Sequence, residues 1–239
     1  MKTVLLVHCG FAGGWTWTSV AERMRRNGHR VHAPTLTGLG ERAHLATPSV
    51  NLTTHIQDLL GVAECEEITD SVVVASSSGA MAATGFVQAT DRRVLRVVYI
   101  DTLVPETGQS WMDLLGPSVS APLLDAATRF GDGWRVPRDD VHPPRWVPQP
   151  LASVTEPLPP ARHPGRVVPV SYVFCTAKPP GWFFGLDAVI AQQAAHAKDN
   201  GWDYHEIESD HLPMLSAPER LADLLHEIAG RSEARSGSR

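Results

Sequence analysis

The chain has 239 residues, of which 43% are hydrophobic and 20% are charged, and its formal net charge is −5. These values are ordinary for a globular protein with one α/β domain. The acidic balance gives no support for binding to nucleic acid or to an anionic membrane surface. The three cysteines, Cys9, Cys65 and Cys175, are too few and too scattered for a disulfide framework.

The amino-terminal segment does not have the pattern of an export signal. Its first apolar run covers only residues 4–7, which is too short for the core of a signal peptide. No stretch of the sequence approaches the roughly 18 apolar residues of a membrane span. We therefore expect a cytoplasmic protein with reduced cysteines.

Strand-like runs and helical patterns alternate along the chain. The first part predicts a strand over 4–8, a helix over 17–27, a strand over 29–33, a long loop over 35–50, a helix over 51–67, a strand over 71–75, a helix over 79–89 and a strand over 94–100. The later part predicts a strand over 168–175, a helix over 186–200, a strand over 202–207 and a helix over 218–229. This alternation predicts an α/β fold, with a mostly parallel, doubly wound sheet of about six strands.

One interval breaks the alternation. The segment from Val104 to Pro169 holds 13 of the 19 prolines, together with Trp111, Trp134 and Trp146. It is too long for a plain connection, and its tryptophans supply apolar area that a disordered segment lacks. We predict that 104–166 is a cap inserted into a core made of 1–103 and 167–230, over the sheet edge where such folds bind ligands. An insertion packed elsewhere is the alternative, and the polar tail 231–239 is expected to be disordered.

The segment 72–80 has the pattern of a strand, a sharp turn and a helix. A β-branched run leads into three serines and then into small residues. Aligned on the G-x-S-x-G pattern of a nucleophile elbow, Ser77 takes the place of the nucleophile and Gly79 that of the last glycine. Ala75 replaces the first glycine. A serine-rich loop without chemistry is the alternative.

A serine hydroxyl attacks only when a base accepts its proton. His211 follows the last predicted strand, so its imidazole can reach over the elbow. A carboxylate should orient that imidazole, but no acid follows the strand that comes after the cap, where 175–182 reads Cys-Thr-Ala-Lys-Pro-Pro-Gly-Trp. Asp101 ends the strand that follows the nucleophile's strand, and we favour it over Asp187, which lies in a predicted helix.

The glycine-rich turn at 8–14 can supply part of an oxyanion hole. Backbone N–H groups aimed at the developing charge are needed there, and we expect them from Gly10 and from Ser78. The glycines of this turn do not have the G-x-G-x-x-G spacing of a dinucleotide site. No H-E-x-x-H motif or Cys/His cluster indicates a metal. The sequence therefore predicts neither a cofactor nor a metal.

Taken together, these residues resemble the α/β-hydrolase superfamily over almost the whole chain. The resemblance is strongest to the compact branch of plant-type methylesterases, hydroxynitrile lyases and related bacterial esterases. It is carried by the segments 7–17, 28–40, 75–81, 99–105 and 209–215. It places the family's nucleophile on Ser77, its base on His211 and its oxyanion amides on Gly10 and Ser78.

Three departures from the family's pattern are informative. Ser76 stands where the family usually has histidine, Ala75 replaces a glycine, and the late acid is absent. In the hydroxynitrile lyases a lysine follows the catalytic histidine, whereas this chain has Leu212 there. The resemblance therefore implies an esterase rather than that lyase.

We expect a cofactor-free serine hydrolase of small esters, lactones or thioesters, acting through an acyl-enzyme as a monomer or a homodimer. Its partner would be a small-molecule substrate, not nucleic acid or a membrane. The side chains expected to contact substrate are Phe11, Trp111, Trp134, Trp146, Trp182 and Leu212. Two alternatives stay open because fold does not determine function. One is a cyclase, decarboxylase or lyase that uses His211 as a general base, and the other is a catalytically silent ligand-binding protein.

Overall fold

The computed structural model describes residues 1–137 and 145–231, and its centre is a sheet of six parallel strands. The strand order is β2-β1-β3-β4-β7-β8. The strands are β1 (Thr3–Val7), β2 (Arg30–His32), β3 (Asp70–Ser76), β4 (Arg93–Ile100), β7 (Val170–Cys175) and β8 (Asp203–Ile207). The predicted α/β fold with a six-stranded parallel sheet is confirmed.

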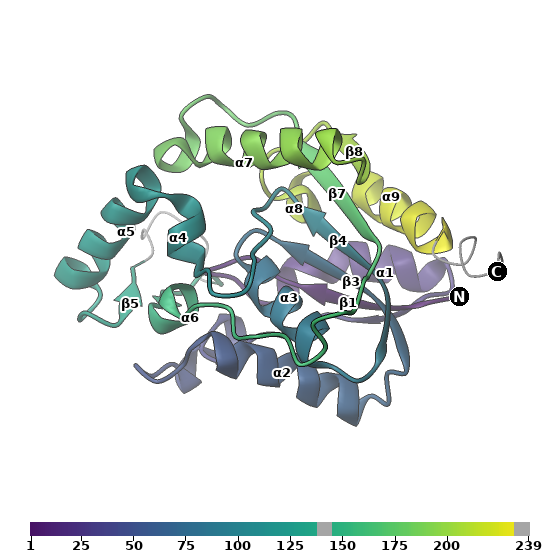
Figure 1. Cartoon of the computed structure of the whole chain (residues 1–239), viewed down its shortest axis with the longest axis horizontal. Helices are drawn as coiled ribbons and strands as arrows, with labels where there is room; N and C mark the ends of the chain where they lie inside the picture. Colours follow the sequence, from purple (N-terminus) through teal and green to yellow (C-terminus); the bar gives the residue numbers. More distant parts are fainter. Residues whose placement is uncertain (138–144, 232–239) are drawn as a thin grey trace.

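Helices cover both faces of this sheet (Figure 1). On one face lie α1 (Thr18–Arg26) and α9 (Pro218–Arg231), which bury apolar side chains against the strands. On the other face lie α2 (Leu52–Cys65), α3 (Gly79–Ala89) and α7 (Trp182–Asp199). Helix α2 begins where its sequence predicts, because Asn51 Oδ1 accepts a hydrogen bond from the Thr54 N–H at 2.9 Å.

Some element boundaries differ from those expected. The predicted loop 35–50 contains a short 3-10 helix, η2 (Gly40–Leu45), and a second one, η1 (Gly14–Trp17), precedes α1. Helix α7 is bounded by Trp182 and Asp199, but Phe183, Phe184 and Gly185 have positive φ, so its regular helical backbone begins at 186, as predicted. Helix α9 continues to Arg231, and 232–239, expected to be disordered, lie outside the described residues.

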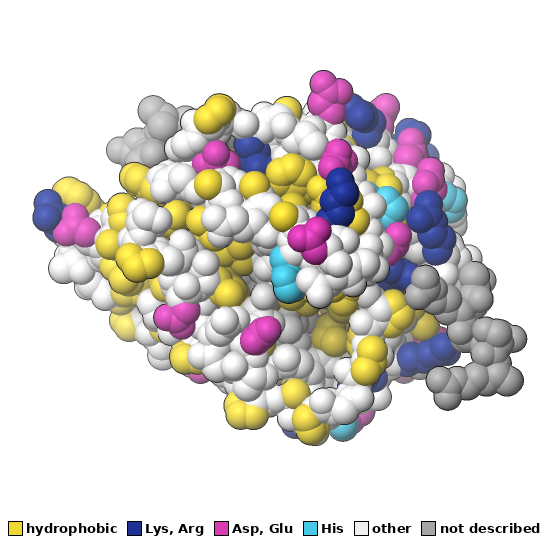
Figure 2. Space-filling model, turned by 45° about the horizontal axis from the view of Figure 1, so that its top comes forward, with side chains coloured by type: hydrophobic (Ala, Val, Ile, Leu, Met, Phe, Trp, Pro, Cys, Tyr) yellow, Lys and Arg dark blue, Asp and Glu magenta, His cyan; other side chains and the backbone are white. Residues whose placement is uncertain are grey.

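The proline-rich interval 104–166 carries secondary structure of its own. Its described elements are α4 (Trp111–Leu115), α5 (Pro117–Phe130), β5 (Arg135–Val136), β6 (Gln149–Pro150) and α6 (Ala152–Thr155). Buried side chains of α4, α5 and β5 belong to the same hydrophobic core as those of α3 and α7. In Figure 1, α4, α5, β5 and α6 lie on the left of the sheet. Figure 2 shows hydrophobic side chains gathered on that half of the molecule and charged side chains mostly on the other.

Candidate active site

Ser77 lies in the tight turn between β3 and α3. Its φ is 51°, in the left-handed region that non-glycine residues rarely adopt and that often marks a functional turn. Gly79 opens α3 so close to the end of β1 that a Cβ there would lie 2.3 Å from the His8 carbonyl oxygen. Glycine at 79 is therefore required by the close approach of helix and strand, and Ala75 is accommodated fully buried within β3.

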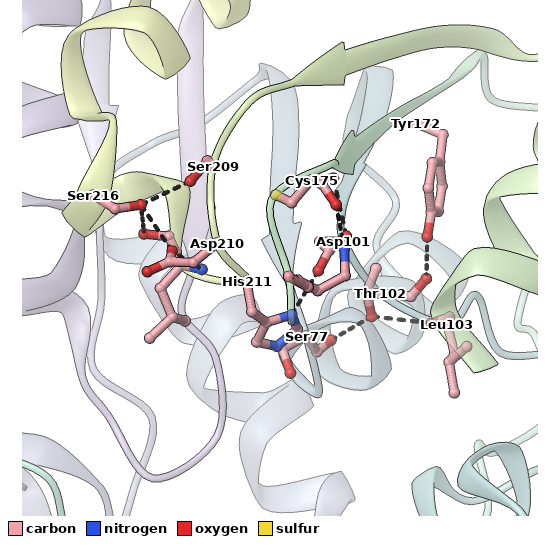
Figure 3. A network of polar contacts seen from close by, with 12 residues as sticks. Ser77, Asp101, Thr102, Leu103, Tyr172, Cys175, Ser209, Asp210, His211 and Ser216 are labelled. Atoms are coloured by element: carbon pink, nitrogen blue, oxygen red, sulfur yellow. Dashed lines mark hydrogen bonds and ion pairs between the residues drawn. The ribbon is translucent and has the colours of Figure 1, made fainter. Parts of the chain in front are cut away.

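His211 lies in the loop between β8 and the short helix α8 (Pro213–Ser216). Its Nδ1 is 2.7 Å from Oδ2 of Asp101. The preceding residue fixes the loop, because Asp210 Oδ1 accepts hydrogen bonds from the Leu212 N–H at 2.9 Å and from the Ser216 hydroxyl at 2.7 Å (Figure 3). With Nδ1–H donating to Asp101, the other ring nitrogen is left free to accept a proton.

Asp101 follows the last residue of β4 and is fully buried, with φ 45°. Its second oxygen, Oδ1, accepts hydrogen bonds from the Cys175 N–H at 3.0 Å and from Nζ of Lys178 at 2.5 Å. Asp187, the other acid considered, accepts a hydrogen bond from the Gly181 N–H at 3.0 Å instead. The structure thus brings Asp101, and not Asp187, to the imidazole of His211.

Neighbouring groups of Asp101 stay protonated. Burial, with a smaller contribution from the Asp101 charge, raises the pKa of the Cys175 thiol and of the Tyr172 phenol well above their usual values. The Tyr172 hydroxyl donates a hydrogen bond to the Thr102 carbonyl at 2.6 Å, and the Thr102 hydroxyl donates one to the Ser77 carbonyl at 2.6 Å (Figure 3). This chain of hydrogen bonds connects the elbow to β7.

Ser77 and His211 line one cavity of about 310 Å³. Figure 3 shows the two labelled residues at the centre of the polar network. Within the described residues, the Ser77 hydroxyl makes no hydrogen bond to the imidazole. Catalytic hydrogen bonds are often absent or long without substrate and form in the complex. The site therefore has its hydroxyl and its imidazole facing a common space.

Gly10 and Ser78 also line the cavity. Within 1–137 and 145–231, neither of their backbone N–H groups donates a hydrogen bond to protein. The turn that carries Gly10 is held by His8, whose Nε2 accepts the Leu36 N–H at 3.0 Å and whose Nδ1 lies 2.8 Å from the Cys9 carbonyl. Burial lowers the pKa of His8 to about 4, so this imidazole is neutral at pH 7. Two backbone donors are thus free to face a developing oxyanion.

The cavity wall is mostly apolar and aromatic. Of the six side chains expected at the substrate, five line it: Phe11, Trp111, Trp146, Trp182 and Leu212. Trp134 does not line it, and that expectation is corrected. The Trp134 ring lies instead under the Arg135 guanidinium, 5.1 Å from the ring centroid. Trp182 lies against the imidazole, with its ring centroid 4.6 Å from that of His211.

Three polar residues of the cavity wall, Gln149, Lys178 and Asp210, were not among the expected site residues. Gln149 of β6 accepts the Phe11 N–H at 2.9 Å through Oε1, so it ties the interval 104–166 to the glycine-rich turn. No sequence signal identifies it, since the contact spans 138 positions. Lys178 lies in the segment 175–182, where the sequence has no acid. Its part in the site becomes evident only from its contact with Asp101.

Other site types find no support in the part of the chain that the structure describes. Residues 1–137 and 145–231 contain no group of three or more His, Cys, Asp or Glu side chains able to hold a metal ion. Among the helices formed by those residues, none combines the length and the apolar character needed to cross a bilayer.

Comparison with known proteins agrees with this geometry. A model of the alpha/beta hydrolase family matches residues 4–224. Over 247 aligned residues the chain is 35% identical to a carbendazim hydrolyzing esterase of Nocardioides sp. (strain SG-4G), covering 94% of this chain and 98% of that one. It is 31% identical over 108 residues to methylesterase 9 of Arabidopsis thaliana, covering 45% and 42% of the two chains.

Solved structures show the same fold. An extracellular alpha/beta-hydrolase from a Paenibacillus species has a TM-score of 0.80 at 18% identity, covering 95% of this chain and 98% of that one. The pyrethroid hydrolase PytH has a TM-score of 0.76 at 18% identity, covering 96% and 98%. The resemblance inferred from the sequence is confirmed: the chain belongs to the alpha/beta hydrolase family, in the branch that holds its esterases.

Proposed function

We propose that this chain is a serine hydrolase that cleaves small carboxylic esters without a cofactor, through an acyl-enzyme formed on Ser77. The observation that carries the proposal is the Asp101–His211 hydrogen bond of 2.7 Å beside an elbow serine that faces the same cavity. In this assignment Ser77 is the nucleophile, His211 is the general base, and Asp101 holds the imidazole in the required tautomer.

The proposed reaction has two halves. In the first, Ser77 Oγ attacks the carbonyl carbon while Nε2 of His211 takes the hydroxyl proton. The N–H groups of Gly10 and Ser78 hold the oxyanion of the tetrahedral intermediate. Collapse of this intermediate breaks the bond to the leaving group, which departs with the proton from His211. In the second half, water attacks the acyl-enzyme and gives a proton to His211, which passes it to Ser77 Oγ as the bond to the acyl group breaks and the acid is released.

The cavity supports a compact substrate with an apolar or aromatic part. Its volume of about 310 Å³ is at the small end of ligand sites, and aromatic rings from α4, α7 and the glycine-rich turn form much of its wall. The 35% identical relative is a carbendazim hydrolyzing esterase. Carbendazim, a flat aromatic methyl carbamate, is therefore the first substrate to test, beside simple aryl esters, lactones and thioesters.

The test compares Ser77→Ala with Ser76→Ala on carbendazim and on short p-nitrophenyl esters. Ser76 is the matched control, because its hydroxyl is buried beside the elbow and has no hydrogen-bond partner among residues 1–137 and 145–231. We expect Ser77→Ala to remove turnover and labelling by a fluorophosphonate probe, and Ser76→Ala to keep both. Wild-type rates in Ser77→Ala would exclude the acyl-enzyme.

The same variants separate the alternative functions. A non-hydrolytic enzyme that uses His211 as its base would lose turnover in His211→Ala and keep it in Ser77→Ala. A silent ligand-binding protein would show neither turnover nor probe labelling in the wild type. Either result would replace the proposed hydrolase.

A further inference from the structure

A buried lysine lies in the segment that follows β7, where the sequence has no acid. Lys178 follows the end of β7 by three residues, and its side chain is only 5% exposed. Its Nζ is 2.5 Å from Oδ1 of Asp101, and it also donates a hydrogen bond to the Cys175 carbonyl. The ammonium lies 4.3 Å from the ring centroid of Phe174. Both hydrogen bonds of this ammonium are thus directed at the acid that faces His211 or at Cys175, whose N–H also binds that acid.

Such a burial is not explained by stability alone. Removing an ammonium from water is unfavourable, and a buried ion pair often recovers no more than that desolvation cost. The geometry shows that the Lys178–Asp101 pair fixes the orientation of the Asp101 carboxylate. Oδ1 of Asp101 is occupied by Lys178 and by the Cys175 N–H, so Oδ2 is the oxygen left for Nδ1 of His211. The carboxylate cannot turn away from the imidazole without breaking both other contacts.

The lysine also changes the charge balance at the imidazole. Asp101 faces Lys178 and His211, so a protonated imidazole would be the second cation on one carboxylate. The other titratable groups here are Cys175 and Tyr172 of β7, Tyr204 of β8 and Asp210 of the histidine loop. Burial raises the pKa of the thiol and both phenols, that of Tyr204 to about 12, which leaves them neutral at pH 7. Lys178 is therefore the only cation paired with Asp101, among the described residues, when His211 is neutral.

We propose that Lys178 is a positioning residue, which locks the Asp101 carboxylate toward His211 and, through its charge, weakens the hold of that carboxylate on a protonated imidazole. This inference rests on the proposed hydrolase chemistry. It implies that kcat/KM stays high to lower pH in the wild type than in a variant that lacks this charge.

The test is the pH dependence of kcat/KM for an aryl ester in the wild type, Lys178→Met and Lys178→Arg. Methionine keeps the apolar stem and removes the charge, so the imidazolium becomes more stable. We expect Lys178→Met to raise the midpoint of the acid limb by roughly one pH unit and to lower kcat/KM at the optimum by at least about tenfold. Lys178→Arg keeps the charge and should leave the midpoint near the wild-type value. Lys198→Met is the matched control, an exposed lysine on α7 whose loss should change neither quantity.

The outcomes distinguish the two proposals. A merely structural lysine would give Lys178→Met a lower melting temperature and a lower rate with the acid limb unmoved, and that result would overturn the inference. Should Lys178→Met not fold, Lys178→Gln makes the same comparison with an uncharged donor, and an unmoved acid limb there has the same meaning. If the wild type cleaves no ester at all, it is the proposed hydrolase itself that fails.

Discussion

Asp101 and His211 are 110 positions apart in the chain, yet Oδ2 of the first lies 2.7 Å from Nδ1 of the second. The contact forms because β4 lies beside β7 and β7 beside β8, all parallel, so the chain segments that leave β4 and β8 emerge at one edge of the sheet. A carboxylate in this place can hold the imidazole in one tautomer and stabilise its cation during proton transfer.

The first prediction concerns this acid. Asp101→Asn keeps the size of the side chain but removes its charge, and we expect kcat for an aryl ester to fall by about 10³–10⁴-fold. Asp187→Asn is the control, because an amide oxygen can still accept the Gly181 N–H, and its kcat should stay near the wild-type value. Steady-state kinetics of the two variants decide the matter. If kcat fell in Asp187→Asn and stayed near the wild-type value in Asp101→Asn, Asp187 would be the acid that acts on His211.

Much of this site could be predicted because its parts follow local patterns. Ser77 stands in a strand–turn–helix segment whose small residues are visible in the sequence, and His211 directly follows a strand. Asp101 could be chosen over Asp187 because parallel strands place their carboxyl ends at one edge of the sheet. In each case a short run of residues specifies the local backbone, and the sheet topology brings the runs together.

The interval 104–166 could not be predicted at the same level. Its short helices and two-residue strands lack a sustained apolar period, and their packing depends on distant partners. For this reason the sequence places Trp134 at the substrate although it lies outside the cavity wall, and no sequence pattern identifies Gln149, which reaches the glycine-rich turn. Lys178 could be read in the sequence, but its role depends on a contact 77 positions away.

A second prediction concerns the oxyanion donors. A Cβ on Gly10 would lie 2.8 Å from the Ser78 hydroxyl oxygen and 3.4 Å from Oε1 of Gln149. The serine side chain can rotate away, so Gly10→Ala should fold, but the turn and its N–H must shift. We expect kcat to fall by about 10²-fold with KM nearly unchanged, the loss that follows when an oxyanion donor is misplaced.

The matched control for Gly10→Ala is Gly61→Ala in α2. A Cβ there meets nothing within 4 Å, and alanine favours the helix by about 1 kcal/mol. Gly61→Ala should therefore keep full activity with a slightly higher melting temperature. If the two alanine variants had equal kcat and KM, the Gly10 N–H would not be an oxyanion donor.

The third prediction separates the two tryptophans. Trp182 lines the cavity and lies against His211, whereas Trp134 does not line it. Trp182→Ala should enlarge the site and remove an aromatic contact worth about 1 kcal/mol, so KM for an aromatic ester should rise about fivefold more than KM for a short alkyl ester. Trp134→Ala, a truncation of the same size at another half-buried position, should leave the ratio of the two KM values unchanged. A change of ratio in Trp134→Ala alone would contradict the assignment of the cavity wall.

The last prediction concerns the pH dependence of stability. The folded-state pKa of His8 is lowered from 6.5 to about 4 by burial, so the unfolded chain binds one more proton than the folded chain between these values. The free energy of unfolding should therefore fall as the pH drops from 6.5 to 4 and level off below, and His8 alone would contribute about 3 kcal/mol to that loss. Buried or half-buried His55, His29 and His32 have lowered pKa values too and act in the same direction.

Urea denaturation at pH 7.5, 6.5, 5.5 and 4.5 measures this loss. The contribution of His8 is isolated with His8→Gln, which keeps an acceptor for the Leu36 N–H but does not titrate. This variant should be less stable than the wild type at pH 7.5 and should lose less stability on acidification. The exposed His44 provides the control, because His44→Gln should follow the wild-type curve. If His8→Gln and the wild type lose stability in parallel down to pH 4.5, then folding does not lower the pKa of His8, and the expected contribution of this residue to acid instability would have to be abandoned.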